Sequence, residues 1–200
     1  MISVLFVEKN SVYKKLPVDC WDADRDARNF AGDDPVICHP PCRLWSKMHR
    51  FSTAPSAEKE LAIFAANLVR RNGGILEHPA ASGLWKVPGI TAGAFLLSVN
   101  QHWWGHPCEK KTILLISGIT MKDVPPVPLN FSCPPKVIAP SKNQVATGRH
   151  LPKSQRNKTP EAFARWLIDL ARLIEVSRQK ESKIDRSGKV SDATNNPDWH

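Results

Sequence analysis

Residues 56–79 of the chain read SAEKELAIFAANLVRRNGGILEHP, and this segment predicts a helix that is followed directly by a strand. Ser56 is the predicted N-cap, because its hydroxyl can accept a hydrogen bond from the first helical turn. Asn72-Gly73-Gly74 ends the helix, and Ile75-Leu76-Glu77 then predicts a strand that ends at His78-Pro79. Apolar residues of the helix follow the three-four spacing of one buried face, at Leu61, Phe64, Ala65, Leu68 and Val69.

Short apolar runs on both sides of this segment predict the rest of a sheet. Further strands are expected at residues 2–7, 18–23, 35–38 and 111–119, and residues 94–102 form another apolar segment. The strand at 35–38 must leave the sheet at Pro40-Pro41, because proline cannot donate to a strand ladder. A strand, a helix and a strand in this order form a parallel crossover. We therefore expect a single α/β domain with a mostly parallel sheet flanked by helices.

The last third of the chain is more polar. Residues 121–157 are rich in proline, lysine and serine, so we expect them to be largely loop. Thr159-Pro160-Glu161 predicts the start of a long amphipathic helix. Residues 179–200 are polar and lack periodicity, and they are expected to be a disordered tail. The predicted domain therefore covers residues 1–178.

Composition restricts the classes of protein that need to be considered. The chain has 200 residues with a formal net charge of +9, which favours a polyanionic partner such as DNA, although a basic tail on a neutral domain is an alternative. No stretch reaches the roughly 18 apolar residues of a membrane helix. The N-terminus reads as a strand and not as a signal peptide. Five cysteines without framework spacing indicate free thiols and a cytoplasmic location.

Residues suited to chemistry follow three of the predicted parallel strands. They are the acidic cluster Asp19, Asp22 and Asp24, the segment Cys38 to Cys42, and Glu77-His78-Pro79. Because ligands of open α/β sheets bind at the carboxyl ends of the strands, we expect these residues to line one cleft. The acidic cluster either binds a ribose hydroxyl of a cofactor or is a solvated loop.

Cys42 is the candidate nucleophile. Two prolines hold it at the end of a strand, and Arg43 or Lys47 is expected to lower the pKa of its thiol. The alternative is a structural turn with a buried thiol. Cysteine and histidine are also zinc ligands, but their spacings here match no zinc signature, so no metal is expected.

Four segments resemble the cytosine-5 DNA methyltransferases, in the order in which that family has them. Residues 40–46, PPCRLWS, resemble the catalytic Pro-Pro-Cys loop, and residues 75–79, ILEHP, resemble the strand that ends in Glu-Asn-Val or Glu-Asn-Pro. Residues 101–112 resemble a later basic segment, and residues 159–164 resemble the start of the final helix. The chain also resembles short proteins of phages and prophages that share these segments.

The resemblance implies a reduced Rossmann-like methyltransferase fold that acts on a base flipped out of DNA. By this resemblance Cys42 would attack the sixth carbon of a pyrimidine, and Glu77 would hydrogen-bond the ring. The residues expected to bind nucleic acid are Arg43, Lys47, Lys110 and Lys111. The cofactor of the family is S-adenosylmethionine.

One departure from the family affects this cofactor. The family has a glycine-rich loop after its first strand, whereas residues 5–10 here read LFVEKN and contain no glycine. Glycine is needed where a backbone approaches a ligand closely. Two alternatives therefore remain open: a non-catalytic module that binds nucleic acid or a host protein, and a nucleobase-modifying enzyme that does not use S-adenosylmethionine.

Overall fold

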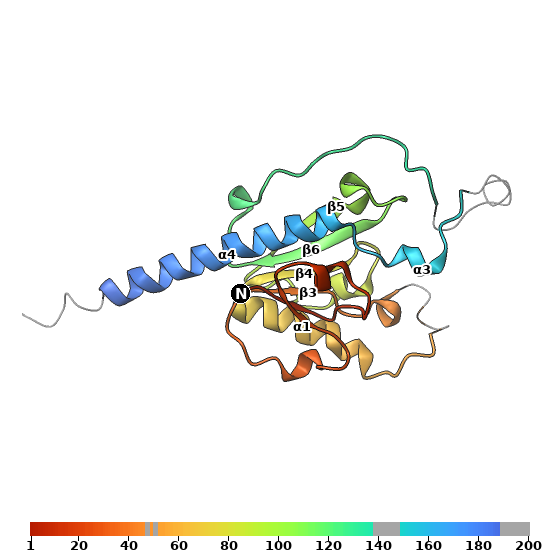
Figure 1. Ribbon diagram of the computed structural model, residues 1–200. Coiled ribbons are helices and arrows are strands. Elements are labelled where there is room, and N and C mark those ends of the chain that lie inside the picture. The colour runs from red at the N-terminus through yellow and green to blue at the C-terminus, as the bar shows by residue number, and fades with distance from the viewer. Residues whose placement is uncertain (47–48, 50–51, 138–148, 189–200) are drawn as a thin grey trace, which may run out of the picture.

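A computed structural model of the chain contains one mixed sheet of six short strands. These are β1 (Ser3–Leu5), β2 (Asp19–Trp21), β3 (Val36–Cys38), β4 (Gly74–Pro79), β5 (Phe95–Asn100) and β6 (Lys111–Ser117). Their order across the sheet is β2-β1-β3-β4-β6-β5 (Figure 1). The structure describes residues 1–46, 49, 52–137 and 149–188, with only the backbone of 153 and 184–188.

The described helices are of two kinds. The α-helices are α1 (Glu58–Asn72), α3 (Lys153–Arg156) and α4 (Glu161–Gly188). The 3-10 helices are η1 (Val12–Lys15), η2 (Ala27–Asn29), η3 (Arg43–Trp45), η5 (Gly83–Lys86), η6 (Gln101–Trp104) and η7 (Met121–Asp123). None of the helices in the described ranges is both long and apolar enough to cross a membrane.

Five strands of the sheet run in one direction, and one strand, β6, runs in the opposite direction. Val4 of β1 lies opposite Cys20 of β2 and Ile37 of β3, and Ile37 lies opposite Ile75 of β4. β6 is antiparallel to both β4 and β5. Helix α1 connects β3 to β4, which is the predicted parallel crossover. The prediction of a single α/β domain with a mostly parallel sheet is therefore confirmed, and the sheet is compatible with a Rossmann-like fold.

The two faces of the sheet are covered by different helices (Figure 1). Alternate residues of each strand point to opposite faces. Val4, Ile37 and Ile75 therefore pack in one apolar cluster with residues of α4, such as Leu167. Residues of the other face pack against α1, namely Leu5, Val36, Cys38, Leu76 and Leu115. Burial on both faces explains why these strands read as nearly continuous apolar runs.

Helix α1 differs in detail from its prediction. Its N-cap is Ala57, and no side chain caps it, so the prediction of Ser56 as the N-cap is wrong. Backbone carbonyls accept the first hydrogen bonds of the helix instead, as the Ser56 carbonyl does from Lys59 N at 3.0 Å. The buried face includes Ala62 and Ala66 beside Ala65, Leu68 and Val69. Alanines at these positions let the helix lie close to the sheet.

Helix α4 is longer than the sequence pattern indicated. It continues to Gly188, so the prediction of disorder is wrong for residues 179–188, and residues 189–200 lie outside the described residues. Adding a residue to an existing helix costs far less than starting one, and this stretch contains no proline before it ends. In the described parts of 121–157 the chain is loop apart from η7 and α3, as expected.

Candidate functional site

A cavity of about 570 Å³ lies at the point where the strand order reverses. β1 has β2 on one side and β3 on the other, so the chain leaves the carboxyl ends of β1 and β3 in opposite directions. Such switch points are where open α/β sheets bind ligands. We call this space the central cavity. Its walls include residues after β1, residues 39–43 after β3, Glu77 and Pro79 of β4, Lys110, and residues 157–159 before α4.

Cys42 and Glu77 both line the central cavity, which confirms the prediction that they lie together. The backbone of His39 continues the ladder of β3 by donating to the Leu5 carbonyl at 3.1 Å. Pro40-Pro41 then turns the chain away from the sheet, which leaves Cys42 half-buried in the cavity wall.

The thiol of Cys42 is held in its protonated form. Burial raises the pKa of Cys42, and the negative charge of Glu77 raises it further. Arg43 does not outweigh these effects, because its guanidinium forms a two-point ion pair with the Glu58 carboxylate of α1. The prediction of a lowered pKa for the Cys42 thiol is therefore wrong. Lys47 lies outside the described residues.

Glu77 is held as a carboxylate by two neighbours. His39 Nδ1 lies 3.1 Å from its Oε2 atom, and Gln101 Nε2 donates to Oε1 at 3.2 Å. Burial raises the pKa of Glu77, but the hydrogen bond from His39 and the charge of Lys110 outweigh burial and bring it to about 2. An ionised carboxylate can only accept hydrogen bonds. The wall of the cavity therefore presents a fixed acceptor.

His39 links this carboxylate to Tyr13, the only tyrosine of the chain. Its Nε2 atom lies 3.0 Å from the Tyr13 hydroxyl. Because Glu77 only accepts, Nδ1 of His39 donates the hydrogen bond to it, and Nε2 shares a hydrogen bond with the Tyr13 hydroxyl. Burial and the charge of Glu77 raise the pKa of Tyr13 well above its usual value, so the phenol stays protonated.

Sequence reasoning missed Tyr13 and Gln101 as parts of this site. Gln101 is fully buried and also donates to the Thr112 hydroxyl at 3.1 Å. The signal that could have indicated Tyr13 is its uniqueness in the chain. Nothing in the sequence pattern indicated Gln101, because it comes from η6, beyond β5.

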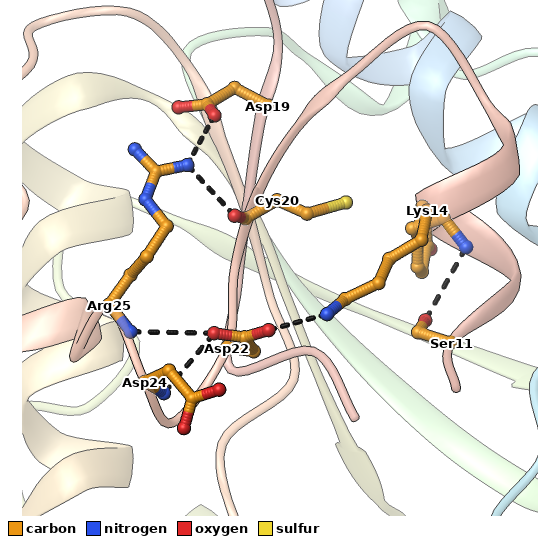
Figure 2. Close-up of polar contacts among 8 residues, drawn as sticks. Ser11, Lys14, Asp19, Cys20, Asp22, Asp24 and Arg25 are labelled. Atoms are coloured by element: carbon orange, nitrogen blue, oxygen red, sulfur yellow. Dashed lines mark hydrogen bonds and ion pairs between the residues drawn. The ribbon is translucent and has the colours of Figure 1, made fainter. Parts of the chain in front are cut away.

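The acidic cluster does not line the central cavity, so the prediction of one shared cleft is wrong for Asp19, Asp22 and Asp24. Figure 2 shows the reason. Asp19 accepts from Arg25 at 2.5 Å, and Asp22 forms an ion pair with Lys14. The hydrogen bond from Arg25 lowers the pKa of Asp19, and that from Lys14 lowers the pKa of Asp22. These carboxylates close a local turn.

No family model matches this chain, and no curated protein matches it. The geometry of the site therefore carries the functional argument. In the described ranges, no three His, Cys, Asp or Glu residues are grouped as a metal site requires.

The basic residues that were predicted to bind nucleic acid do not all lie at the same cavity. Lys110 lines the central cavity, and its Nζ donates to the carbonyls of Asn157 and Lys158 at 3.3 and 3.4 Å. It thereby fixes the segment that precedes α4. Lys111 is exposed outside this cavity and lies 3.5 Å from Glu109.

The residues after β1 do not fit S-adenosylmethionine as the methyltransferases bind it. Side chains of Phe6, Val7 and Glu8 line the cavity where that family has glycines. Phe6 has a φ of 62°, a strained conformation for a residue with a side chain. Of the carboxylates in and after β2 that could bind a ribose, Asp19 is engaged by Arg25 and Asp22 by Lys14. We therefore derive no step through this cofactor.

Proposed function

We propose that this protein is an enzyme that acts on a pyrimidine base of DNA, with Cys42 as its nucleophile. The observation that carries the proposal is that Cys42 and the ionised Glu77 line one cavity at the carboxyl ends of β3 and β4. The volume of about 570 Å³ lies within the range of small-ligand sites. A base held in a duplex cannot enter such a space, so the substrate is a flipped or unpaired base.

The chemistry that this site supports is addition of a thiol to the pyrimidine ring. The sulfur of Cys42 forms a bond to the sixth carbon, and the electron pair of the C5–C6 double bond takes up a proton at the fifth carbon. The thiol loses one proton and the ring gains one, so no further reactant is required. When the reaction reverses, either hydrogen on the fifth carbon can leave. The expected result is exchange of that hydrogen with solvent.

Glu77 orients the base in this scheme. A fixed carboxylate accepts a hydrogen bond from the amino group of cytosine. His39 and Gln101 bind one carboxylate oxygen each, and each oxygen has a second lone pair for the base. Because Glu77 raises the pKa of the Cys42 thiol, a base that shields this charge would also favour the thiolate.

The test is hydrogen exchange in a single-stranded oligonucleotide that contains one cytosine. In heavy water, the wild-type protein is expected to replace the hydrogen on the fifth carbon with deuterium, as measured by mass spectrometry. Cys42→Ser should lower the exchange rate by at least about 10³-fold, because it removes the nucleophile. Cys133→Ser is the matched control, since Cys133 is an exposed free thiol outside the central cavity, and it should exchange normally.

A 5-fluoropyrimidine at the same position should raise the population of the adduct, because fluorine makes the sixth carbon more electrophilic. The proton added at the fifth carbon can leave again, so the adduct is captured by rapid acid quenching before it reverses. A trapped species should appear with wild type and with Cys133→Ser, but not with Cys42→Ser. Absence of both exchange and adduct in wild type that binds the oligonucleotide would reject the enzymatic proposal.

One observation favours a second candidate, a non-catalytic module that binds nucleic acid. The thiol of Cys42 has a raised pKa and no free cation from Arg43, which does not suit a nucleophile that is active without substrate. Under this alternative the wild-type protein binds the oligonucleotide without exchange, and Cys42→Ser binds it equally well.

A further inference from the structure

A second cavity, of about 420 Å³, lies beside the central one. We call it the side cavity. It is bordered by the end of β5, by η6, and by residues 130–132 and 134 of the loop that follows η7. Hydrogen bonds attach that loop to the body: His102 Nε2 lies 3.2 Å from the Ser132 hydroxyl, and Lys136 N donates to the Pro107 carbonyl at 2.9 Å.

The two cavities share a thin wall. Pro79 and Lys110 line the central cavity, whereas their chain neighbours Ala80 and Lys111 line the side cavity. The backbone of Ala80 donates to the Lys111 carbonyl at 3.0 Å, which joins the two segments. Residues adjacent in the chain therefore line both cavities, and backbone pairing holds these two segments together. A ligand that crosses this wall could occupy both cavities.

The side cavity is lined by aromatic faces and free amide donors. Phe131 is 88% exposed, and Trp103 is half-buried. The Oδ1 atoms of Asn100 and Asn130 accept backbone hydrogen bonds, from His102 and Ser132 among others. Neither Nδ2 atom has a hydrogen-bond partner in the part of the chain that the structure describes. Aromatic faces stack on unpaired bases regardless of sequence, and amide donors suit base carbonyls.

The charges place a base, and not a phosphate, in the side cavity. Glu109 and Lys111 both line it and lie 3.5 Å apart, so the pair leaves no net positive charge for a phosphate inside the cavity, while the carboxylate can accept from a base amino group. Lys111 follows Lys110 of the central cavity, so the phosphate that links two nucleotides would cross beside these lysines. A peptide could also use the aromatic faces, but a continuous strand with bases on both sides of a basic wall fits both cavities together.

We propose that the side cavity binds the base next to the one in the central cavity, on the same single strand. The substrate is thereby an unpaired segment of at least two nucleotides, with the neighbouring base stacked on Phe131 and Trp103. This inference rests on the proposed function, because it takes a pyrimidine to occupy the central cavity.

The test measures affinity for a short single-stranded oligonucleotide with one central cytosine, by fluorescence anisotropy. Phe131→Ala should weaken binding about tenfold, since stacking of one base contributes roughly 1–3 kcal/mol. An abasic site on one side of the cytosine should weaken binding of the wild-type protein by a similar factor. The oligonucleotide with that abasic site should bind wild type and Phe131→Ala equally.

Leu129→Ala is the matched control. Leu129 is 60% exposed on the same loop but does not line the side cavity, so its replacement should change affinity by less than about twofold. Phe131 is itself so exposed that its replacement should not disturb folding, which circular dichroism checks.

The outcomes separate the two proposals. If Phe131→Ala binds the intact oligonucleotide as tightly as wild type, the side cavity is not a nucleotide subsite and this inference is overturned, whether or not Cys42 exchanges hydrogen. A second outcome is that Phe131→Ala weakens binding only when the neighbouring base is present, while cytosine shows no hydrogen exchange. That result supports the subsite and rejects the enzymatic proposal. If the wild-type protein binds none of these oligonucleotides, both proposals fail.

Discussion

At the scale of single residues, the site is built from groups whose protonation depends on their surroundings. Glu77 remains ionised because His39 donates to it and Lys110 is close, and Cys42 remains protonated because it is half-buried beside that charge. One wall of the central cavity therefore holds a carboxylate that stays ionised and a thiol that stays protonated. In the proposed reaction, the reactivity of Cys42 depends on how the substrate changes the charge of Glu77.

His78 provides a prediction at this scale. It is fully buried next to Glu77, and its ring meets Trp85 edge-on at 6.0 Å. Burial lowers the pKa of His78 to about 4, although the Glu77 charge and the Pro41 carbonyl oppose this. In the unfolded chain the imidazole binds a proton near pH 6.5. Between these values the unfolded state binds more protons, so the free energy of unfolding falls as the pH falls from about 6.5 to about 4.

His78→Phe removes the titrating group and should flatten this part of the profile by up to about 3 kcal/mol. Urea denaturation at several pH values between 7 and 4 measures the effect. His49→Gln, at an exposed histidine, should leave the slope as in wild type. An unchanged slope in His78→Phe would mean that another group causes the loss of stability.

At the scale of elements, the site depends on how closely β3 and β4 approach each other. Gly74 begins β4 with a φ of 127°, and a Cβ atom there would lie 2.1 Å from the carbonyl oxygen of Val36. The two strands carry His39, Cys42 and Glu77 at or beyond their far ends. Only glycine combines this backbone conformation with this approach.

Gly74→Ala is therefore expected to lower the free energy of unfolding by about 3 kcal/mol or more, from backbone strain and from overpacking against β3. Gly89→Ala is the matched control, since Gly89 also has a positive φ, of 73°, but has no atom within 4 Å of the added methyl. It should cost only about 1 kcal/mol. Equal losses in the two variants would show that the contact with Val36 is relieved at no cost.

At the scale of the whole molecule, the net charge of +9 should govern association with nucleic acid. Each phosphate contact releases counterions, so affinity for the single strand should fall linearly on a plot of log affinity against log salt. About three contacts would give a slope of about −2. Lys15 lines the central cavity and forms no ion pair with any residue that the structure describes, so it is a candidate contact.

Lys15→Gln should make this slope shallower by about 0.7, as measured by anisotropy titrations between 50 and about 300 mM salt. Lys122→Gln makes the same change in net charge on η7, away from both cavities, and should leave the slope unchanged. If both variants change the salt slope equally, the slope reports the total charge of the protein and not a phosphate contact at Lys15 in the central cavity.

The sequence by itself determined the parallel crossover and the meeting of Cys42 with Glu77. The helical periodicity of residues 56–72 ends at two glycines, and Pro40-Pro41 ends β3. These are local signals, and parallel strands connected by a crossover have their carboxyl ends at one edge of the sheet. Any chain with that order of elements brings the two residues to the same end.

Only the tertiary structure decided the protonation of the site and the presence of the side cavity. His39 contacts Glu77, which is 38 positions away in the sequence, and Tyr13, which is 26 positions away. Gln101 contacts Glu77 from η6, which follows β5. Two carboxylates of the acidic cluster, Asp22 and Asp19, pair with Lys14 and Arg25, and Arg43 pairs with Glu58 of α1. A pKa depends on burial and on charges within a few ångströms, and these distances are set by packing between elements that the order of residues does not encode locally.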